Sequence, residues 1–430
     1  MKSLEKEHLI RKPFSVLVLW LLLVFAVGPA NAEEQPCNDT APCVASPVAP
    51  LTLGLHADMN FRPDTSETLA LVANSGASSV RADVLWSAVE RTPGLFKWSR
   101  YDAIFETAAS QRLRVLPVLV SPPRWAAPRW NTIPASSRAF GGFAAHAAAR
   151  YGPGGTFWKL NPDLPQLPAT HFEVWNEPYI AEFSASGVDP GTYARFFKGV
   201  VTAAQPANPA VKWLIQSDEY GHRADGSLVE WVDAMYDAVP DLNSYFDAVA
   251  VHPYSPAEGP DLCYRDPENP DWDEWNYCRI DMQRATYLRH GAADKPFWIT
   301  EVGWPSCFQS SQRSVLSRAE RSRRTKAVRR RVTGRRSPRA RGRASSVKCR
   351  NGVTESTRAA HYERQAELVA ATPWVHALFF YELGDDSPAH GDAEGWYGIV
   401  SVEGRRTRSY QKVQAIADSW SLVGRRVNLR

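Results

Sequence analysis

The sequence predicts a (β/α)8 barrel, or TIM barrel, and three observations support this fold class. Short apolar runs alternate with helix-like stretches along most of the chain, which is the element order of parallel α/β proteins. The runs are apolar throughout, as is typical of strands buried on both faces. Polar or aromatic residues follow nearly every run, which indicates a rim decorated all the way round. An open doubly wound sheet, the alternative, places its ligand at a single switch point.

Eight strands and eight helices account for the chain after residue 50. Asp64 and Glu67 have capping-box spacing, and Asp189 followed by Pro190 is typical of a helix start. Pro117 argues against one strand, because central strands avoid proline. We expect strands at residues 51–56, 79–84, 114–120, 171–175, 211–216, 246–251, 297–300 and 375–381. We expect helices up to residue 75, at 99–111, 136–151, from 189, and at 227–239, 281–290, 357–371 and 407–420.

The first 32 residues have the layout of a secretory signal peptide. Basic residues precede an apolar run at 14–27, and Ala30-Asn31-Ala32 follows as a small-residue cleavage site. The run is short for a membrane-spanning helix of about 20 residues, so an uncleaved anchor is the weaker alternative. Residues 33–50 are an irregular lead-in, and residues 51–430 form the barrel. We therefore expect a secreted or periplasmic, soluble protein, which a content of 44% apolar and 22% charged residues fits.

The six cysteines suit an oxidising compartment. Their spacing suggests three local disulfides, although six cysteines allow 15 connectivities. A metal site is the rival interpretation, but the chain has no Cys-x-x-Cys and no His-x-x-x-His. We expect neither metal nor cofactor. The suggested pairs are Cys37 with Cys43, Cys263 with Cys278, and Cys307 with Cys349.

One segment carries most of the positive charge. Residues 313–350 hold 16 Lys and Arg against one acid, a net +15 in a chain whose total is +4, so the remainder is net −11. Such an excess of one charge favours disorder by self-repulsion. One hypothesis is that the segment captures an anionic polymer by counterion release. The alternative is that it is an insertion without a role, or the result of an error in how the gene was read.

Two strands end in a carboxylic acid. Residues 171–178 read His-Phe-Glu-Val-Trp-Asn-Glu-Pro, and Glu177 falls where Pro178 forces the chain to turn. Residues 296–306 have the same build and place Glu301 after another apolar strand. A residue at the C-terminal end of a barrel strand faces the mouth of the barrel. The two acids are therefore expected to face each other, rather than to be unrelated surface residues.

Paired carboxylates across a barrel mouth suit glycoside hydrolysis, in which one is a protonated acid and the other an ionised nucleophile. Glu177 is the candidate acid, because its neighbours can partly desolvate it. Glu301 is the candidate nucleophile, which Arg81 can keep ionised by an ion pair; the alternative is that Arg81 pairs with Asp83 or Asp58 at the rim.

Eight further residues are candidates for substrate binding. Asn176 is placed to bond a sugar hydroxyl, and His252 with Tyr254 is placed to orient Glu301 or a sugar. Aromatic faces serve sugar rings as stacking surfaces, although most of the 16 tryptophans are expected to be core or loop packing. The candidates are Arg81, Asn176, His252, Tyr254, Trp86, Trp125, Trp304 and Tyr381.

Trp175-Asn176-Glu177-Pro178, together with Ile299-Thr300-Glu301, resembles the catalytic pattern of glycoside hydrolase clan A, and the chain is most similar to families 5 and 39. The resemblance covers residues 51–306 and 355–415. It implies a (β/α)8 barrel and a retaining mechanism with Glu177 as acid/base and Glu301 as nucleophile. Asn176, Arg81, His252 and Tyr254 match further positions of the pattern. Two features depart from it: Tyr381-Glu382 stands where many members have tryptophan, and the basic segment is additional.

The sequence therefore predicts a monomeric β-glycosidase that acts on a polysaccharide or oligosaccharide. The alternative is a barrel that has lost activity and binds a carbohydrate or an anionic polymer; the presence of both acids argues against it. Sugar, linkage and endo or exo action are set by rim loops, and the sequence does not specify them.

Overall fold

A computed structural model describes residues 51–60, 64–255, 257–261, 277–306, 352–385 and 394–427. These residues belong to one compact unit, Val48–Arg430. The expected signal peptide, the lead-in, the basic segment and five of the six cysteines lie outside the described residues. Cys278, the remaining cysteine, is disulfide-bonded, and the three expected pairings stay predictions. Among the described residues, no helix combines the length and apolar character that crossing a membrane requires.

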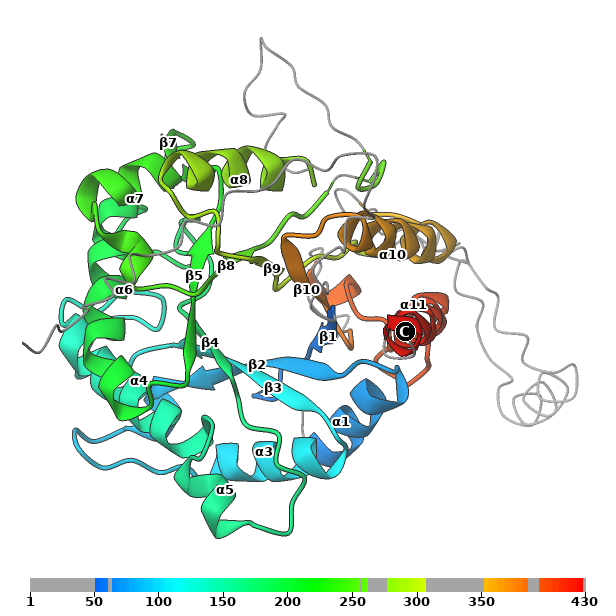
Figure 1. Ribbon diagram of the computed structural model, residues 1–430, viewed down its shortest axis with the longest axis horizontal. Helices are drawn as coiled ribbons and strands as arrows, with labels where there is room; N and C mark the ends of the chain where they lie inside the picture. Colours follow the sequence, from blue (N-terminus) through cyan, green and yellow to red (C-terminus); the bar gives the residue numbers. More distant parts are fainter. Residues whose placement is uncertain are drawn as a thin grey trace, which may run out of the picture. The chain divides into compact units, whose positions relative to one another are not determined.

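Eight parallel strands close into a barrel, which confirms the predicted fold class (Figure 1). Each barrel strand pairs with the next in the chain, and β1 closes the ring against β10. Between β5 and β8 the chain inserts a separate two-stranded hairpin, β6–β7. The barrel strands are β1 Thr52–His56, β2 Ser79–Leu85, β3 Arg114–Val120, β4 His171–Val174, β5 Lys212–Ser217, β8 Ala248–Val251, β9 Phe297–Ile299 and β10 Val375–Phe380.

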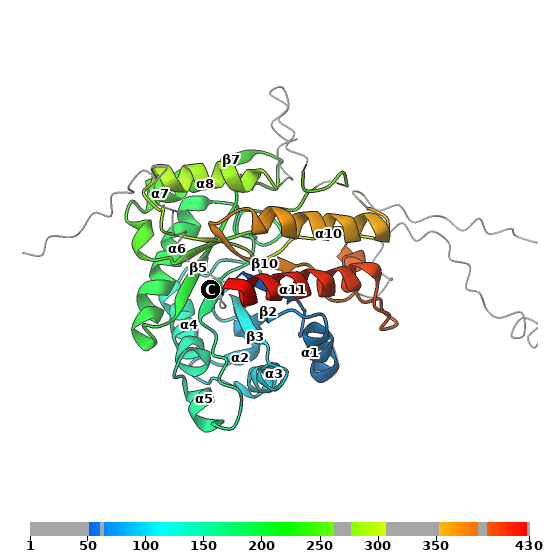
Figure 2. The same ribbon diagram turned by 45° about the vertical axis from the view of Figure 1, so that its right-hand side comes forward.

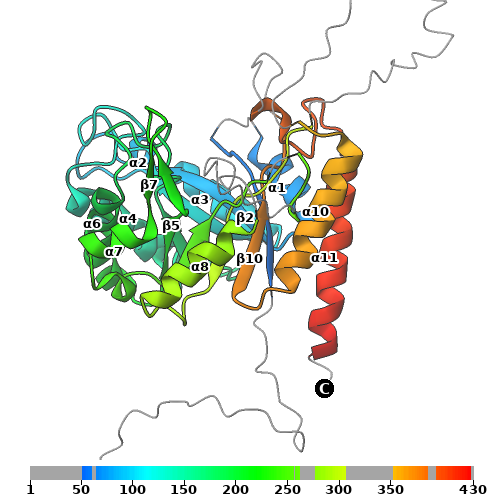
Figure 3. The ribbon, with the colours of Figure 1, turned by 90° about the horizontal axis from the view of Figure 1, so that it is seen from above.

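Helices surround the strands (Figures 1 and 2), and the long α10 and α11 run side by side (Figure 3). Several begin at side-chain caps: Asp64 accepts from the backbone N–H of Glu67, and Asp189 from that of Thr192. The α-helices are α1 Thr65–Asn74, α2 Trp86–Val89, α3 Ser99–Ser110, α4 Ser137–Tyr151, α5 Thr156–Leu160, α6 Pro190–Ala204, α7 Val232–Ala238, α8 Arg279–Arg289, α10 Glu355–Ala370 and α11 Arg408–Val427.

Side chains fill the barrel, so its interior is a core rather than a pore. This inner cluster is apolar and consists of Leu116, Leu214, Ala248, Ala250, Ala377 and Phe379, with Trp298 packed against it. Gly54 of β1 lies directly against the ring of Phe379, where a Cβ atom would come within 2.2 Å of the ring. The interior therefore requires glycine at this position in order to accommodate the phenyl ring.

Two local expectations need correction or explanation. The helix expected at 227–239 is wrong in its first part, where β7 (Leu228–Glu230) pairs with β6 (Tyr220–His222). Ser227 does not cap a helix; its N–H and hydroxyl both donate to Asp225, at 3.0 and 2.7 Å, and so form the hairpin turn. Pro117 does lie within β3, but the register with β4 begins only at Val118.

Candidate active site

Four strands bring the predicted charged residues together at the barrel mouth. Arg81 lies on β2, while Glu177, His252 and Glu301 follow β4, β8 and β9. Arg81, His252 and Glu301 are buried, and the Glu177 side chain is 14% exposed. The mouth therefore holds a compact, mostly dry cluster of charges.

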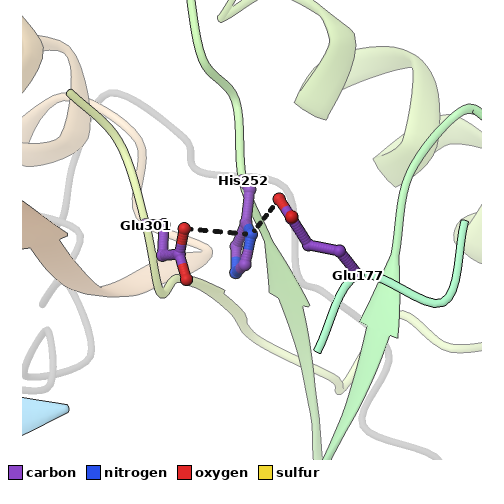
Figure 4. A group of neighbouring side chains, drawn as sticks. All are labelled: Glu177, His252 and Glu301. Atoms are coloured by element: carbon purple, nitrogen blue, oxygen red, sulfur yellow. Dashed lines mark hydrogen bonds and ion pairs between the residues drawn. The ribbon is translucent and has the colours of Figure 1, made fainter. Parts of the chain in front are cut away.

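His252 stands between the two predicted acids (Figure 4). Its Nδ1 lies 2.8 Å from Oε1 of Glu177 and 3.6 Å from Oε2 of Glu301. One carboxylate oxygen of each acid and a ring nitrogen of His252 all lie within 4.8 Å of one another. Retaining glycosidases hold their carboxyl groups about 5–5.5 Å apart, and inverting enzymes about 6.5–9.5 Å. The nearest carboxylate oxygens of the two acids are therefore close to the retaining spacing and well short of the inverting one.

The backbone around Glu177 is unusual. Trp175 and Glu177 both have positive φ, 72° and 41°, a conformation that costs a non-glycine residue about 1 kcal/mol or more. The Trp175 indole donates to the carbonyl of Phe183 at 2.9 Å, and its backbone N–H donates to Leu119 at 2.9 Å. These contacts hold the strained turn, which sends Asn176 and Glu177 into the mouth.

Arg81 organises the floor of the site. Its Nε and Nη2 each donate to Glu173 at 3.0 Å, and Nη2 also donates to Oδ1 of Asn176 at 2.8 Å. Its Nη1 donates to Glu301 and lies 3.1 Å from Nδ1 of His56. Burial and the charge of Arg81 lower the pKa of His56 to about 4, so His56 is neutral and accepts this bond. Arg81 therefore contacts Glu301 directly, as the sequence suggested.

The two acids differ in protonation because their surroundings differ. Burial raises the pKa of Glu177 above its ordinary value, and the hydrogen bond and charge of His252 only partly oppose this. Burial also raises the pKa of Glu301, but the charges of His252 and Arg81 outweigh it and hold that pKa below its ordinary value. Glu177 is thus the more readily protonated and Glu301 the more readily ionised.

His252 itself is cationic. Burial lowers its pKa, yet the charge of Glu301, the carboxylate of Glu173 at 3.8 Å and the hydrogen bond to Glu177 raise it overall to about 10. Both ring nitrogens then donate: Nδ1 to Glu177 and Nε2 to Oγ1 of Thr300 at 3.0 Å. The Thr300 hydroxyl extends this series of hydrogen bonds, because it donates to Glu173 at 3.2 Å. The imidazolium is therefore fixed in orientation from both sides.

One tyrosine bonds Glu301, and two more pack around that tyrosine. The Tyr254 hydroxyl donates to Oε2 of Glu301 at 2.8 Å. The Tyr254 ring contacts Tyr381 and Tyr397, with centroids 6.2 and 5.9 Å apart, and Tyr381 packs on His56 at 5.1 Å. Tyr254 thus contacts Glu301, as the sequence suggested, and Tyr381 stays a candidate stacking surface. Tyr397 comes from the segment after β10 and was not anticipated.

The expectation that Trp86 and Trp304 stack on sugars is wrong. Both side chains are fully buried and have no exposed face. Trp86 packs in the core, and its indole donates to Glu90 at 2.6 Å. Trp304 packs against His361 and Tyr362. Trp125 is 40% exposed and remains a candidate.

Sequence reasoning missed Glu173, the most deeply buried acid of the site. Burial raises its pKa, but Arg81 and His252 outweigh this and lower it to about 2. Gln216 of β5 also donates to it. A signal was present, because Glu173 interrupts an apolar strand and a buried acid must be paired. Its partners, however, are 43 or more positions away in sequence.

Glu177, His252 and Glu301 also offer three ligand atoms of the kind that binds metals. A metal ligand must be a neutral imidazole, whereas the pKa of His252 is raised to about 10. A metal would first have to displace the proton that His252 donates to Glu177. The hydrogen bond of His252 to Glu177 and its ion pair with Glu301 already account for the proximity of the three groups.

The fold is a (β/α)8 barrel, and several solved glycoside hydrolases share it. Among solved structures, the chain is similar to a family 39 glycoside hydrolase from Bacteroides cellulosilyticus WH2, with 18% identity, a TM-score of 0.57, and coverage of 86% of this chain and 64% of that one. It is also similar to xylanase 10B from Thermotoga petrophila RKU-1 in complex with xylobiose, with 12% identity, a TM-score of 0.52, and coverage of 86% and 94%. A GH5_18 variant from Streptomyces cattleya in complex with Manβ1-4GlcNAc shows 15% identity, a TM-score of 0.51, and coverage of 86% and 81%.

No family model matches the chain, and no curated protein matches it in sequence. The chain spans 64% and 59% of the length of the first two structural neighbours, the second being the exo-β-1,4-mannosidase Op5Man5 from Opitutaceae bacterium strain TAV5. At these identities the likeness is one of fold. It confirms the (β/α)8 barrel that the sequence predicted.

Proposed function

We propose that the protein is a retaining β-glycoside hydrolase that acts on a polysaccharide or oligosaccharide. Glu177 is the general acid/base and Glu301 the nucleophile. The observation that carries the proposal is the spacing of the two carboxylates within 4.8 Å across the barrel mouth. Their opposite pKa shifts support the division of roles, because one reaction needs a proton donor and an ionised nucleophile at once.

In the first step, the ionised Glu301 attacks the anomeric carbon while Glu177 transfers its proton to the glycosidic oxygen. The bond from the anomeric carbon to this oxygen breaks, the leaving sugar departs as an alcohol, and a glycosyl ester with Glu301 remains. Arg81 and Tyr254, which donate to Glu301, hold its carboxylate in position. Asn176, fixed through Oδ1 by Arg81, presents its amide to the sugar.

In the second step, Glu177, now ionised, takes a proton from a water molecule that attacks the same anomeric carbon. The ester bond to Glu301 breaks, the sugar leaves with its original anomeric configuration, and both acids return to their starting states. His252 bonds Glu177 and stabilises its ionised form. This stabilisation helps the acid to become a base between the two steps.

The test is chemical rescue with azide. We expect Glu301→Ala to lose hydrolysis, and azide to restore turnover by occupying the space of the missing carboxylate, which yields a glycosyl azide of inverted configuration. Glu106, an exposed acid on α3, provides the control Glu106→Ala, which retains activity. Full hydrolysis by Glu301→Ala would remove Glu301 as the nucleophile. A panel of soluble β-glycans, with released sugars identified by mass, would define the substrate.

We also propose that the protein is secreted after cleavage behind Ala32. The support is the order of charged, apolar and small residues in the first 32 positions. N-terminal sequencing of the protein recovered outside the cytoplasm checks this, and a mature chain that still begins at Met1 would contradict it.

A further inference from the structure

A pocket adjoins the proposed catalytic centre between the ends of β2, β3 and β4. Its water-accessible volume is about 30 Å³, so it is a shallow recess that admits the edge of a ligand lying over it rather than a whole sugar ring. Its polar and aromatic lining is Asp83, Ser121, Trp130, Asn131, Asn176 and Phe183. Asn176 belongs both to this pocket and to the hydrogen-bond network of Arg81. A ligand in the pocket would therefore be contiguous with a sugar held at Glu177.

The pocket offers polar groups that have no protein partner. The Asp83 carboxylate makes no hydrogen bond or ion pair with a described residue; only its backbone carbonyl is used, by Asn60. Oδ1 of Asn131 is buried without a partner, although Nδ2 of the same side chain donates to the carbonyl of Glu182 at 2.6 Å. Oδ1 of Asn176 is taken by Arg81, which leaves its amide N–H groups for a ligand. Desolvated groups of this kind favour a ligand that completes their hydrogen bonds.

An aromatic wall faces these groups. Trp130 is 53% exposed, which is unusual for so large an apolar side chain. It packs edge to face against Phe183, with centroids 5.8 Å apart and an interplanar angle of 84°. The contact fixes the indole while a large part of it stays open. A rigid aromatic ring beside hydrogen-bond acceptors is suited to a sugar, which has apolar C–H faces and hydroxyl edges.

The charge of the pocket narrows the choice of sugar. Asp83 lies on the same face of β2 as Arg81, two residues further toward the mouth, but Arg81 is engaged by Glu173 and Glu301. Among the charges that act on the pKa of Asp83, the positive Arg81 ranks first, and the negative Asp58, Glu301 and Glu173 together oppose it. A sugar that carries a carboxylate would meet like charge here, whereas a neutral sugar can donate its hydroxyls to Asp83 and Asn131.

We propose that this pocket is a sugar-binding subsite that selects neutral over acidic glycans, with Trp130 as its stacking surface and Asp83 as its specificity-determining residue. The proposal rests on the proposed function in taking a glycan as the ligand, and it adds a second binding position and the charge class of the substrate. Asp83 and Trp130 act on binding, and neither takes part in bond cleavage.

Calorimetric titration tests the subsite in the full chain with Glu177→Gln, which prevents turnover. The probes are cellotetraose, xylotetraose and mannotetraose, together with the β-1,4-linked tetramer of glucuronate as the acidic counterpart of cellotetraose. Titrations at pH 8 keep Asp83 ionised, since burial raises its pKa only to about 7. We expect at least one neutral tetramer to bind. Trp130→Ala should lower its affinity about tenfold, and Trp130→Phe should restore much of that loss.

Asp83→Asn keeps the size of the side chain and removes its charge. We expect it to lower the affinity for the neutral tetramer severalfold and to raise the affinity for the glucuronate tetramer relative to that for the neutral one. Leu160→Ala, an exposed position on α5, is the control, and thermal melting verifies that each variant is folded. The subsite is refuted if Trp130→Ala and Asp83→Asn bind like the parent, if no neutral probe binds, or if the glucuronate tetramer binds more tightly than cellotetraose. If the wild-type protein hydrolyses no glycan but a tetramer still binds in a way that depends on Trp130, the proposed function is refuted while the sugar-binding subsite stands.

Discussion

Arg81 donates two parallel hydrogen bonds to Glu173, each 3.0 Å long, beneath the mouth of the barrel. The pair joins β2 to β4, and its side chains are 1% and 0% exposed. Arg81 also bonds Glu301 and Asn176, the neighbour of Glu177. The ion pair with Glu173 therefore fixes an arginine that contacts the segments of both proposed catalytic acids. Stability and catalysis are therefore linked through one guanidinium group.

Glu173→Gln is expected to destabilise the protein by about 3 kcal/mol, because it leaves a buried guanidinium without one of its two carboxylate partners. In the wild type, the pKa of Glu173 is lowered to about 2, so its contribution is present above the ordinary value near 4.5 and is lost as the pH falls through about 2. Urea unfolding of wild type and variant at several acidic pH values measures both effects. Glu106→Gln, on the exposed face of α3, is the control. If wild type and Glu173→Gln have equal free energies of unfolding at pH 7, the Arg81–Glu173 pair contributes nothing to stability.

Glu177→Ala is expected to slow hydrolysis of natural glycosides strongly, because their leaving group needs a proton. The hydrolysis rate of substrates whose leaving group has a low pKa should fall much less, since Glu301 can still attack them. Azide should then accelerate turnover and yield a product of retained configuration, the opposite of the product from Glu301→Ala. Proton NMR of the glycosyl azides distinguishes the two outcomes. Inverted products from both variants would refute the assigned roles.

The pH dependence of kcat/KM should follow the two acids. Glu301 must be ionised and Glu177 protonated, so we expect a bell-shaped profile. His252 lowers the pKa of both acids, and His252→Asn should therefore shift both limbs toward higher pH. Tyr254→Phe is the matched variant: it removes a hydrogen bond from Glu301, so only the acid limb should move upward. If the alkaline limb of His252→Asn stays in place, His252 does not tune Glu177.

Trp86→Phe should act on stability rather than on substrate binding, because Trp86 is fully buried and stacks on Phe143 with centroids 5.9 Å apart. We expect a loss of about 2 kcal/mol in the free energy of unfolding, because the ring is smaller and Oε2 of Glu90 loses its hydrogen-bond donor. KM at a temperature where the variant is folded should be unchanged. An increase in KM without loss of stability would restore Trp86 as a binding residue.

The sequence by itself determined the barrel and the two acids at its mouth. Strands that are apolar throughout must be covered on both faces, and Pro178 prevents the strand from continuing past Glu177, which leaves that acid at the barrel mouth. Both are properties of short stretches of chain. Only the tertiary structure decided that Glu173 pairs with Arg81, that His252 lies between the acids, that Trp86 is buried and that Trp130 is exposed. These depend on strand register and ring closure, which bring together side chains 75 or more positions apart, such as His252 and Glu177 or Arg81 and Glu173. No local pattern encodes such pairings.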